Sequence, residues 1–424
     1  MQPARADQKD PMVWCKLGTI AFLTLVCIRL TVVPYPYFDE IHYLPAAREL
    51  LVLGEFTNRE HPLFGKMILA ASIALFGDNP LGWRGPSALA GAFALFAAMR
   101  ALWFAIFSRA ATLTYGVLLA TGGLLFVHAR IAMLEAFMLA FLALAFWQAA
   151  AAMREPETAR RRLAVTGVAL GLAMGAKWNA LVLTPMFGLA FLVMRMRAGR
   201  RRLLWSRRGA PVPGMTLVEA GLWLGVLPLA VYAATFLPAY FYASGAIGAE
   251  GLVAHHVTMF ELQSSLKTPH NYQSVWWQWA LNVRGIWYLY EPVEGVQRGV
   301  LLIGNPVTML LGLAAVAWCG WRGLAKPDAI AGAVAGLYAL TLGFWAVAAK
   351  PVQFYYHYLL PSMFLLAALA LALAHLWESG RRWAVAAVLT SSAIAFAWLW
   401  PIYSAAALAD ERAFQRWAIL EGWR

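Results

Sequence analysis

Long continuous runs of apolar residues, separated by short polar segments, fill most of the chain. Many windows of about 20 residues are apolar enough to span a bilayer. The runs are continuous rather than alternating, which predicts helices and not a β-barrel. We therefore expect an all-α polytopic membrane protein with about 11 transmembrane helices. The expected spans are 13–33, 86–107, 112–128, 131–152, 163–177, 178–195, 215–238, 299–319, 329–349, 353–375 and 383–402.

Composition and charge agree with this class. Apolar residues make up 62% of 424 positions and charged residues 13%, against roughly 45–50% and about 25% in soluble domains. The net charge of +13 does not indicate nucleic acid, because Lys and Arg follow the positive-inside rule. The Arg-rich segment 195–208 has no acidic residue, which places it and the N-terminus in the cytoplasm. The run 12–33 lacks a small-residue cleavage site and is interpreted as an uncleaved first span.

Two stretches outside the expected spans are long, 34–85 and 239–298, and both fall on the extracytoplasmic side. Loops of that length in a compact protein usually carry function. No linker or low-complexity segment divides the chain, so we expect one transmembrane domain over 1–424, in which 299–402 forms a C-terminal region of about four spans.

An adjacent acid pair, Asp39 and Glu40, opens the first loop. The segment that follows ends at Gly54 and is expected to form an amphipathic helix on the membrane surface. Its apolar side is formed by Leu44, Ala47, Leu50, Leu51 and Leu53. Spacing alone also allows Asp39 to be a helix cap and Glu40 a solvated first-turn carboxylate.

Several basic residues are expected at the same membrane face as the acid pair. Each alone is commonly an interfacial anchor, and Glu135 could form a core ion pair with Arg130. Because they converge with two acids on one face, we interpret them together as a site that binds the phosphate of a donor. They are Lys66, Arg84, Arg130, Lys177, Arg284 and His357, and Lys350 stands at the same face.

The second loop contains an aromatic cluster around Arg284. It is either an interfacial girdle or a wall that stacks against a sugar and holds a lipid phosphate. The candidate residues for a sugar or acceptor wall are His61, His270, Tyr272, Trp276 and Trp277. The adjacent His255 and His256 cannot both face one metal from a helix, so no metal site is expected.

Eight short segments stand in order along the chain: FDEIHY, EHPLFGK, WRGPSALAG, ARIAMLEAF, GLAMGAKWNAL, HNYQSVWWQWALNVRGIWY, GNPV and FYYHYLLPSMF. This ordered set resembles the protein O-mannosyltransferases, which are integral-membrane glycosyltransferases of the GT-C fold class. The resemblance covers residues 35 to 375. It implies a bacterial member that lacks the soluble β-trefoil module of eukaryotic members.

The resemblance also implies an activity. It implies inverting transfer of mannose from a polyprenyl-phosphate donor to Ser or Thr of an exported protein, at the periplasmic face of the bacterial inner membrane. It gives Asp39 the role of base, with Glu40 beside it. Family basic positions are matched by Arg84, Arg130, Lys177 and Arg284, and His357 matches a Tyr-His-Tyr segment. The implied partners are membrane lipid, the lipid-linked sugar, the acceptor protein and the export machinery, with no nucleic acid and no further cofactor.

The chain departs from the family pattern at His61-Pro62-Leu63, where His-Pro-Pro is usual, and at Glu135, where Asp is typical. A related family that transfers aminoarabinose to lipid A shares the early acid and Pro-Leu region, so a glycolipid acceptor is a second candidate. A lipid or sugar transporter is a third. Transporters bind near the midplane between two corresponding halves, whereas the ionisable residues here are expected at one face.

The chemistry of transfer fits these residues independently of the resemblance. A Ser or Thr hydroxyl is a poor nucleophile and needs a carboxylate to accept its proton. One carboxylate suffices for inversion, and a retaining mechanism needs a second as nucleophile. The departing lipid phosphate gains negative charge, which Arg or Lys stabilises.

Overall fold

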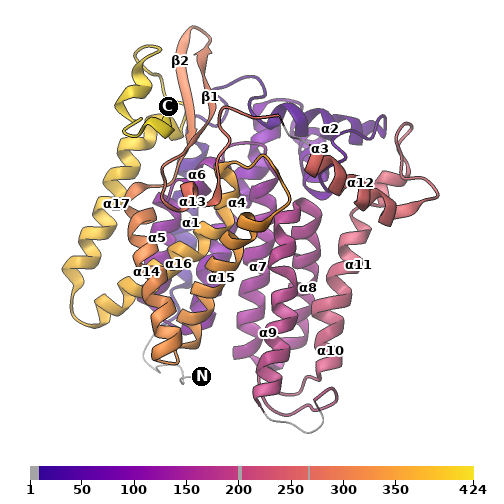
Figure 1. The fold of residues 1–424 in the computed structure, drawn as a ribbon, viewed down its shortest axis with the longest axis vertical. Helices are drawn as coiled ribbons and strands as arrows, with labels where there is room; N and C mark the ends of the chain where they lie inside the picture. Colours follow the sequence, from indigo (N-terminus) through magenta and orange to yellow (C-terminus); the bar gives the residue numbers. More distant parts are fainter. Residues whose placement is uncertain (1–8, 199–202, 266–267) are drawn as a thin grey trace.

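The computed structural model describes residues 9–198, 203–265 and 268–424. Long helices run side by side, and the shorter elements gather at one end, the upper end in Figure 1. Within the described residues, eight helical segments are long and apolar enough to cross a membrane. They are α4 (Pro80–Ile106), α7 (Leu134–Arg154), the turn leading into α9 (Trp178–Arg197), α10 through α11 (Leu217–Ala234), α14 (Pro306–Ala325), α15 (Ala329–Val347), the turn leading into α16 (Tyr355–Glu378) and α17 (Arg382–Tyr403).

The remaining predicted spans correspond to helices that are shorter or, in α8, long enough at 18 residues but with three Arg in the first turn. They are α1 (Met12–Cys27) for 13–33, α5 (Arg109–Thr121) with α6 (Leu124–His128) for 112–128, and α8 (Ala159–Ala176) for 163–177. Because α1 has 16 residues and α5 has 13, length alone does not make them complete spans. The membrane-protein class and the mostly helical fold are confirmed, and the number of spans stays a prediction.

The second long loop contains a β-hairpin, which the all-α prediction missed. Strand β1 (Ile286–Val293) pairs antiparallel with β2 (Val296–Leu302). The two residues between them, Glu294 and Gly295, have φ angles of 51° and 80°. Positive φ at both central residues is typical of a type I′ turn, whose twist suits a tight hairpin.

The predicted span 299–319 is therefore wrong at its start. Residues 299–302 are the end of β2, and α14 begins only at Pro306, after the Asn305 cap. The error has a simple cause, because the buried end of β2 is a continuous apolar run that cannot be told from the start of a helix by hydropathy.

Four short helices lie at the upper end of the molecule in Figure 1. They are α2 (Glu40–Val52), α3 (Phe64–Phe76), α12 (Gly251–Ser265) and α13 (Trp276–Ala280). The predicted helix after the acid pair is present as α2, with Leu44 and Ala47 buried and Val52 exposed. Whether α2 lies on a bilayer stays a prediction. The apolar helix α3 within the first loop was not predicted.

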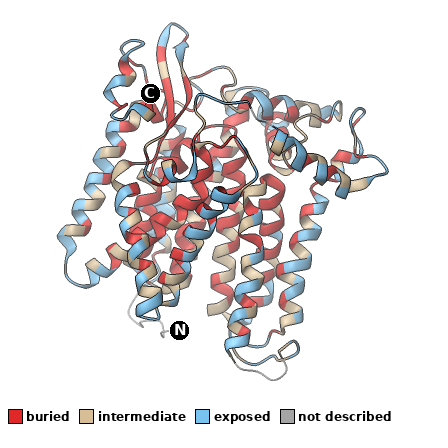
Figure 2. Cartoon of the chain, viewed as in Figure 1, coloured by how far each residue is buried: buried red, intermediate tan, exposed pale blue. Residues whose placement is uncertain are grey.

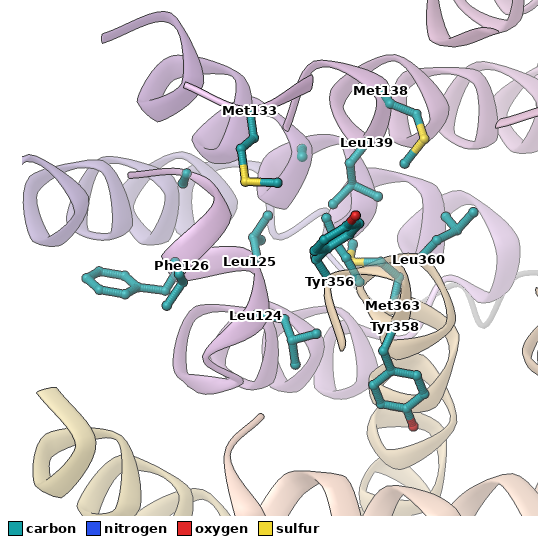
Figure 3. Packing of buried hydrophobic residues seen from close by; sticks show 14 of the residues in the cluster. Leu124, Leu125, Phe126, Met133, Met138, Leu139, Tyr356, Tyr358, Leu360 and Met363 are labelled. Carbon is teal, nitrogen blue, oxygen red and sulfur yellow. The ribbon is translucent and has the colours of Figure 1, made fainter. Parts of the chain in front are cut away.

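Buried residues concentrate in the middle of the bundle and continue into the base of the upper layer (Figure 2). Helix α7 lies against both α4 and α8. Small residues permit close approach, as is usual between membrane helices: a Cβ at Gly91 of α4 would overlap Ala129. Figure 3 shows Met133, Met138 and Leu125 packed around Tyr356, so the aromatic segment before α16 is part of the core.

Candidate active site

Asp39 lies at the N-terminus of α2, but its carboxylate does not cap the helix. No backbone N–H of the first turn donates to it, and its nearest side-chain donor is the Tyr43 hydroxyl at 3.4 Å. The preceding residue, Phe38, has a φ of 52° and stacks on Tyr288 with ring centroids 4.0 Å apart. Left-handed backbone at a bulky residue is strained and tends to occur at functional sites. The structure therefore removes the capping explanation for Asp39 and leaves the carboxylate available.

The environment of Asp39 favours its neutral form. Burial raises its pKa to about 6, against the opposing effect of the Lys177 ammonium, while the Glu135 carboxylate adds to the increase. The side chain is only partly enclosed. A carboxylate with a pKa close to the working pH, in partial contact with solvent, has the properties of a general base.

Glu40 is placed very differently from its neighbour. Both Glu40 and Arg84 are 0% exposed, and the Arg84 Nε and Nη2 atoms each donate to the Glu40 carboxylate at 2.8 Å. The backbone N–H groups of Ala132 and Tyr37 also donate to Glu40, at 2.9 and 3.2 Å. Arg84 donates further to the carbonyl of Val33 at 2.7 Å. This buried ion pair holds the start of α2 against α4 and the α6–α7 connection.

The ion pair bears on the catalytic role predicted for Glu40 and the phosphate-binding role predicted for Arg84. Each oxygen of Glu40 and each nitrogen of the Arg84 guanidinium already has a protein partner. The geometry favours a positioning role for both residues: they fix the backbone from which Asp39 projects.

Arg130 and Lys66 are likewise occupied by the protein. Arg130 donates to the carbonyls of Val26, Ile28 and Ser404, and the Lys66 ammonium donates to the carbonyls of Asn58 and His61 at 2.7 and 3.0 Å. Both cations donate to backbone carbonyls at helix ends and in turns. Their geometry therefore favours a structural role over contact with a donor.

Two lysines remain next to Asp39. Lys177 forms an ion pair with Glu135, which corrects the expected pairing of Glu135 with Arg130. Its ammonium also lies 5.1 Å from the centroid of Tyr356. Lys350 is partly exposed and takes part in no ion pair or side-chain hydrogen bond with any described residue.

The surroundings of Lys350 lower its pKa toward neutral pH. Burial lowers its pKa to about 8, as does the neighbouring Lys177 ammonium, whereas Asp39 opposes the change. A cation without a carboxylate partner can neutralise a phosphate. Sequence reasoning noted Lys350 at this face, and the structure makes it the strongest candidate for contact with a donor phosphate.

The predicted wall residues separate into two groups. His270 contacts Phe354, with centroids 5.1 Å apart, Phe354 stacks on Tyr356 at 5.4 Å, and Tyr356 meets Phe38 at 6.2 Å. The His270 ring also neighbours Tyr272 at 6.0 Å. A continuous path of rings thus leads from the second loop to the residue before Asp39. Trp276 and Trp277, in contrast, are 39% and 46% exposed and make no ring contact in the described structure.

The other three predicted residues have distinct surroundings. His61 meets Tyr43 at 5.6 Å, and burial together with the charge of Lys177 lowers the pKa of His61, which keeps it neutral. His357 is buried and stacks on Trp345 at 3.8 Å, inside the bundle. Arg284 donates to the carbonyl of Asn271 within the second loop. His61 therefore packs on Tyr43, which donates to Asp39, whereas His357 and Arg284 support the surrounding structure.

Asn282 fixes the second loop, and sequence reasoning missed it. It is buried with a φ of 58°, and its amide exchanges hydrogen bonds with the backbone of Gly304 at 2.9 and 3.1 Å. The Tyr355 hydroxyl donates to the same amide oxygen, and the Trp423 indole donates to the Asn282 carbonyl at 2.8 Å. The C-terminal tail, the turn after the hairpin and the segment before α16 thus meet at one residue, Asn282.

Replacing Tyr355 by Phe is expected to destabilise the protein by about 1–3 kcal/mol, because it removes two buried hydrogen bonds, the one that the hydroxyl donates to the Asn282 amide and the one that it accepts from the Gly304 N–H. Thermal unfolding in detergent measures this. The matched control is Tyr240→Phe, since Tyr240 is exposed. Equal melting temperatures for the two variants would show that the Asn282 network does not hold the loop.

The fold is similar to solved membrane glycosyltransferases. The protein O-mannosyltransferase Pmt1-Pmt2 complex of S. cerevisiae, bound to the sugar donor, superposes with a TM-score of 0.77 at 14% identity, covering 97% of this chain and 93% of that one. ArnT from Cupriavidus metallidurans, bound to undecaprenyl phosphate, gives a TM-score of 0.53 at 16% identity, covering 86% of this chain and 61% of that one. The chain therefore has the GT-C glycosyltransferase fold.

Sequence comparison narrows this class to a family. The model described as dolichyl-phosphate-mannose-protein mannosyltransferase matches residues 16–241, and that of the C-terminal four-TMM region of protein-O-mannosyltransferase matches 249–326. The chain belongs to this family. The polyprenol-phosphate-mannose–protein mannosyltransferase of Mycobacterium tuberculosis is 26% identical, covering 97% of this chain and 92% of the relative. Its counterpart in Corynebacterium glutamicum is 27% identical, covering 88% and 84%.

Proposed function

We propose that this protein transfers mannose from a polyprenyl-phosphate-mannose donor to Ser or Thr hydroxyls of exported proteins, with inversion at the anomeric carbon. The observation that carries the proposal is the Asp39 carboxylate, which is free of the helix cap and has a pKa that burial raises and that the positive charges of Lys177 and Lys350 oppose. The family to which the chain belongs indicates polyprenyl-phosphate mannose as the donor and a protein as the acceptor.

The reaction follows from these groups. Asp39 accepts the proton of the acceptor hydroxyl as its oxygen attacks the anomeric carbon. The bond from that carbon to the phosphate oxygen breaks, and its electron pair stays on the lipid phosphate. Lys350, together with Lys177, stabilises the negative charge that the phosphate gains.

Inversion is favoured by the state of the other acids. A retaining mechanism needs a second free carboxylate as nucleophile. Of the other acids around Asp39, Glu40 is locked to Arg84, Glu135 is paired with Lys177, and Glu60 accepts a hydrogen bond from the Asn58 amide at 2.7 Å. Asp39 is left to act alone.

The proposed site lies at the periplasmic face of a bacterial inner membrane, within a single membrane domain over 1–424. An acceptor would meet it on leaving the export machinery, in an extended state. The ring path from His270 to Phe38 offers a surface for the sugar or the acceptor chain.

A donor panel tests the proposal. Purified protein in liposomes is given polyprenyl phosphates that carry mannose, glucose or aminoarabinose, with Ser- and Thr-containing peptides or lipid A as acceptors, and products are read by mass. Mannosylated peptide is expected. Modification of lipid A alone, or movement of donor across the bilayer without transfer, would replace the proposal with the glycolipid or transporter alternative.

The pH dependence of kcat/KM is expected to be bell-shaped. Asp39 must be deprotonated, so the rate falls as the pH drops through about 6, and Lys350 must be charged, so the rate falls as the pH rises through about 8. Because kcat/KM reports groups of the free enzyme, these limits refer to the site without donor. Lys350→Arg is expected to remove the alkaline limb and keep the acid limb. An unchanged alkaline limb in that variant would exclude Lys350 as its source.

A further inference from the structure

Three arginines meet at the outer end of α17, away from Asp39. Arg29, just after α1, donates to the Ser404 hydroxyl at 2.8 Å. Arg298 of β2 donates to the carbonyl of the next residue, Ala405, at 2.8 Å. Arg130 donates to the carbonyl of Ser404 at 3.2 Å. Figure 1 places α17 and β2 on the opposite side of the upper end from α12.

No carboxylate of the described chain neutralises this cluster. The nearest acid by strand register, Glu291, stands opposite Arg298 in the hairpin. Its carboxylate accepts a hydrogen bond from Tyr35 at 2.9 Å and forms no ion pair with Arg298. The carbonyls at the end of α17 supply only about half a negative charge. Three guanidinium groups thus keep a large positive excess.

The cluster also has hydrogen-bonding capacity to spare. The Nε atoms of Arg29 and Arg298 are enclosed without any partner. Each side chain uses one terminal nitrogen on α17, and both side chains are partly exposed. Their other terminal nitrogens are therefore available to an anion that approaches from outside. A phosphate, which can accept from two guanidinium groups at once, matches this arrangement.

The surroundings of the cluster are those of a membrane interface. The Arg29 guanidinium lies 5.9 Å from the ring of Trp400. Exposed apolar side chains occur nearby in the sequence, Ile28 beside Arg29 and Trp398 two residues before Trp400 on α17. Aromatic residues and arginines at the end of a span are typical of the headgroup level. An anion that binds at the headgroup level is expected to be the headgroup of a lipid, whose apolar chains lie in the bilayer.

We infer that Arg29 and Arg298 form a site for the phosphate headgroup of an anionic membrane lipid in the extracytoplasmic leaflet, and that the buried Arg130 adds to its positive charge. The bound lipid neutralises the three cations and ties α1, β2 and α17 together at the surface. The site is separate from Asp39, and the inference does not depend on the proposed transfer reaction.

Lipid binding by the purified protein tests the inference without any donor. Phosphatidylglycerol is titrated into protein in neutral detergent, and bound lipid is counted by native mass spectrometry while the melting temperature is followed. Wild type is expected to bind saturably and to melt at higher temperature. The double variant Arg29→Gln/Arg298→Gln is expected to bind at least about tenfold more weakly, since two charge-assisted contacts are lost.

The matched control is Arg381→Gln/Arg382→Gln, which removes two exposed arginines from the other end of α17 and is expected to keep wild-type affinity. If the double variant does not fold, Arg298→Gln alone is expected to weaken binding at least about threefold. Equal affinity in test and control variants overturns the inference. So does full displacement of the lipid by inorganic phosphate, which would indicate a site for free anions, or by polyprenyl phosphate at equal concentration, which would indicate a donor site.

Discussion

Replacing Asp39 by Asn is expected to lower mannose transfer by two orders of magnitude or more and to leave the fold unchanged. General-base catalysis contributes about 10²–10⁴ in rate, and an amide cannot accept the hydroxyl proton. The side chain caps no helix and is only partly enclosed, so an isosteric amide should fit without strain. Transfer from polyprenyl-phosphate mannose to a Ser peptide measures the rate, and thermal melting checks the fold.

Asp78→Asn provides the control for this experiment. Asp78 also belongs to the first loop and lies at the surface, where it accepts from Arg48 at 2.8 Å. Its loss removes an equal charge from the same part of the chain, and it is expected to change the rate by less than about threefold because exposed ion pairs contribute little. Near-normal transfer by Asp39→Asn would rule out Asp39 as the base.

The sequence was sufficient for what depends on local pattern. Hydropathy located the long helices, although their ends differ from the predicted spans by up to seven residues at α14, and the free acid at Asp39 could be proposed because a charged pair beside a span is costly. The hairpin was missed although Glu294-Gly295 between apolar residues is a turn signal. The apolar end of β2 runs on toward α14 and hid that signal.

Partners distant in sequence could not be predicted. Asp39 and Glu40 are adjacent and chemically alike, yet Asp39 is only partly enclosed and unpaired among the described residues, whereas Glu40 is fully buried against Arg84. That difference depends on how α2 meets α4, which is a property of packing. In the same way, Glu135 pairs with Lys177 rather than with Arg130, which is nearer in the sequence. Trp423, near the end of the chain, donates to the carbonyl of Asn282. Sequence reasoning therefore found the residues of the site more readily than their roles.

Replacing Glu40 by Gln is expected to destabilise the protein by roughly 3–5 kcal/mol, the usual cost of leaving one partner of a buried ion pair without its counter-charge. Gln keeps the shape of Glu, so the loss reflects charge and not a cavity. The Arg84 guanidinium would stay 0% exposed without a counter-charge, and one of its N–H donors would face the NH2 group of the Gln amide instead of a carboxylate oxygen. Thermal unfolding in detergent measures the change, and transfer is expected to fall as well because α2 carries Asp39.

The same Asp78→Asn variant serves as the control, since it breaks an exposed ion pair in which Arg48 and Asp78 are 39% and 44% exposed; it is expected to cost about 0–1 kcal/mol. A double-mutant cycle with Arg84→Gln separates the pair from its surroundings. If Glu40 and Arg84 act as a unit, the double variant is expected to be more stable than the sum of the two single changes predicts. Two outcomes would mean that Asp39 is held in place by something other than this pair. One is that the stability losses of the two single variants add up in the double variant, and the other is that Glu40→Gln has the melting temperature of wild type.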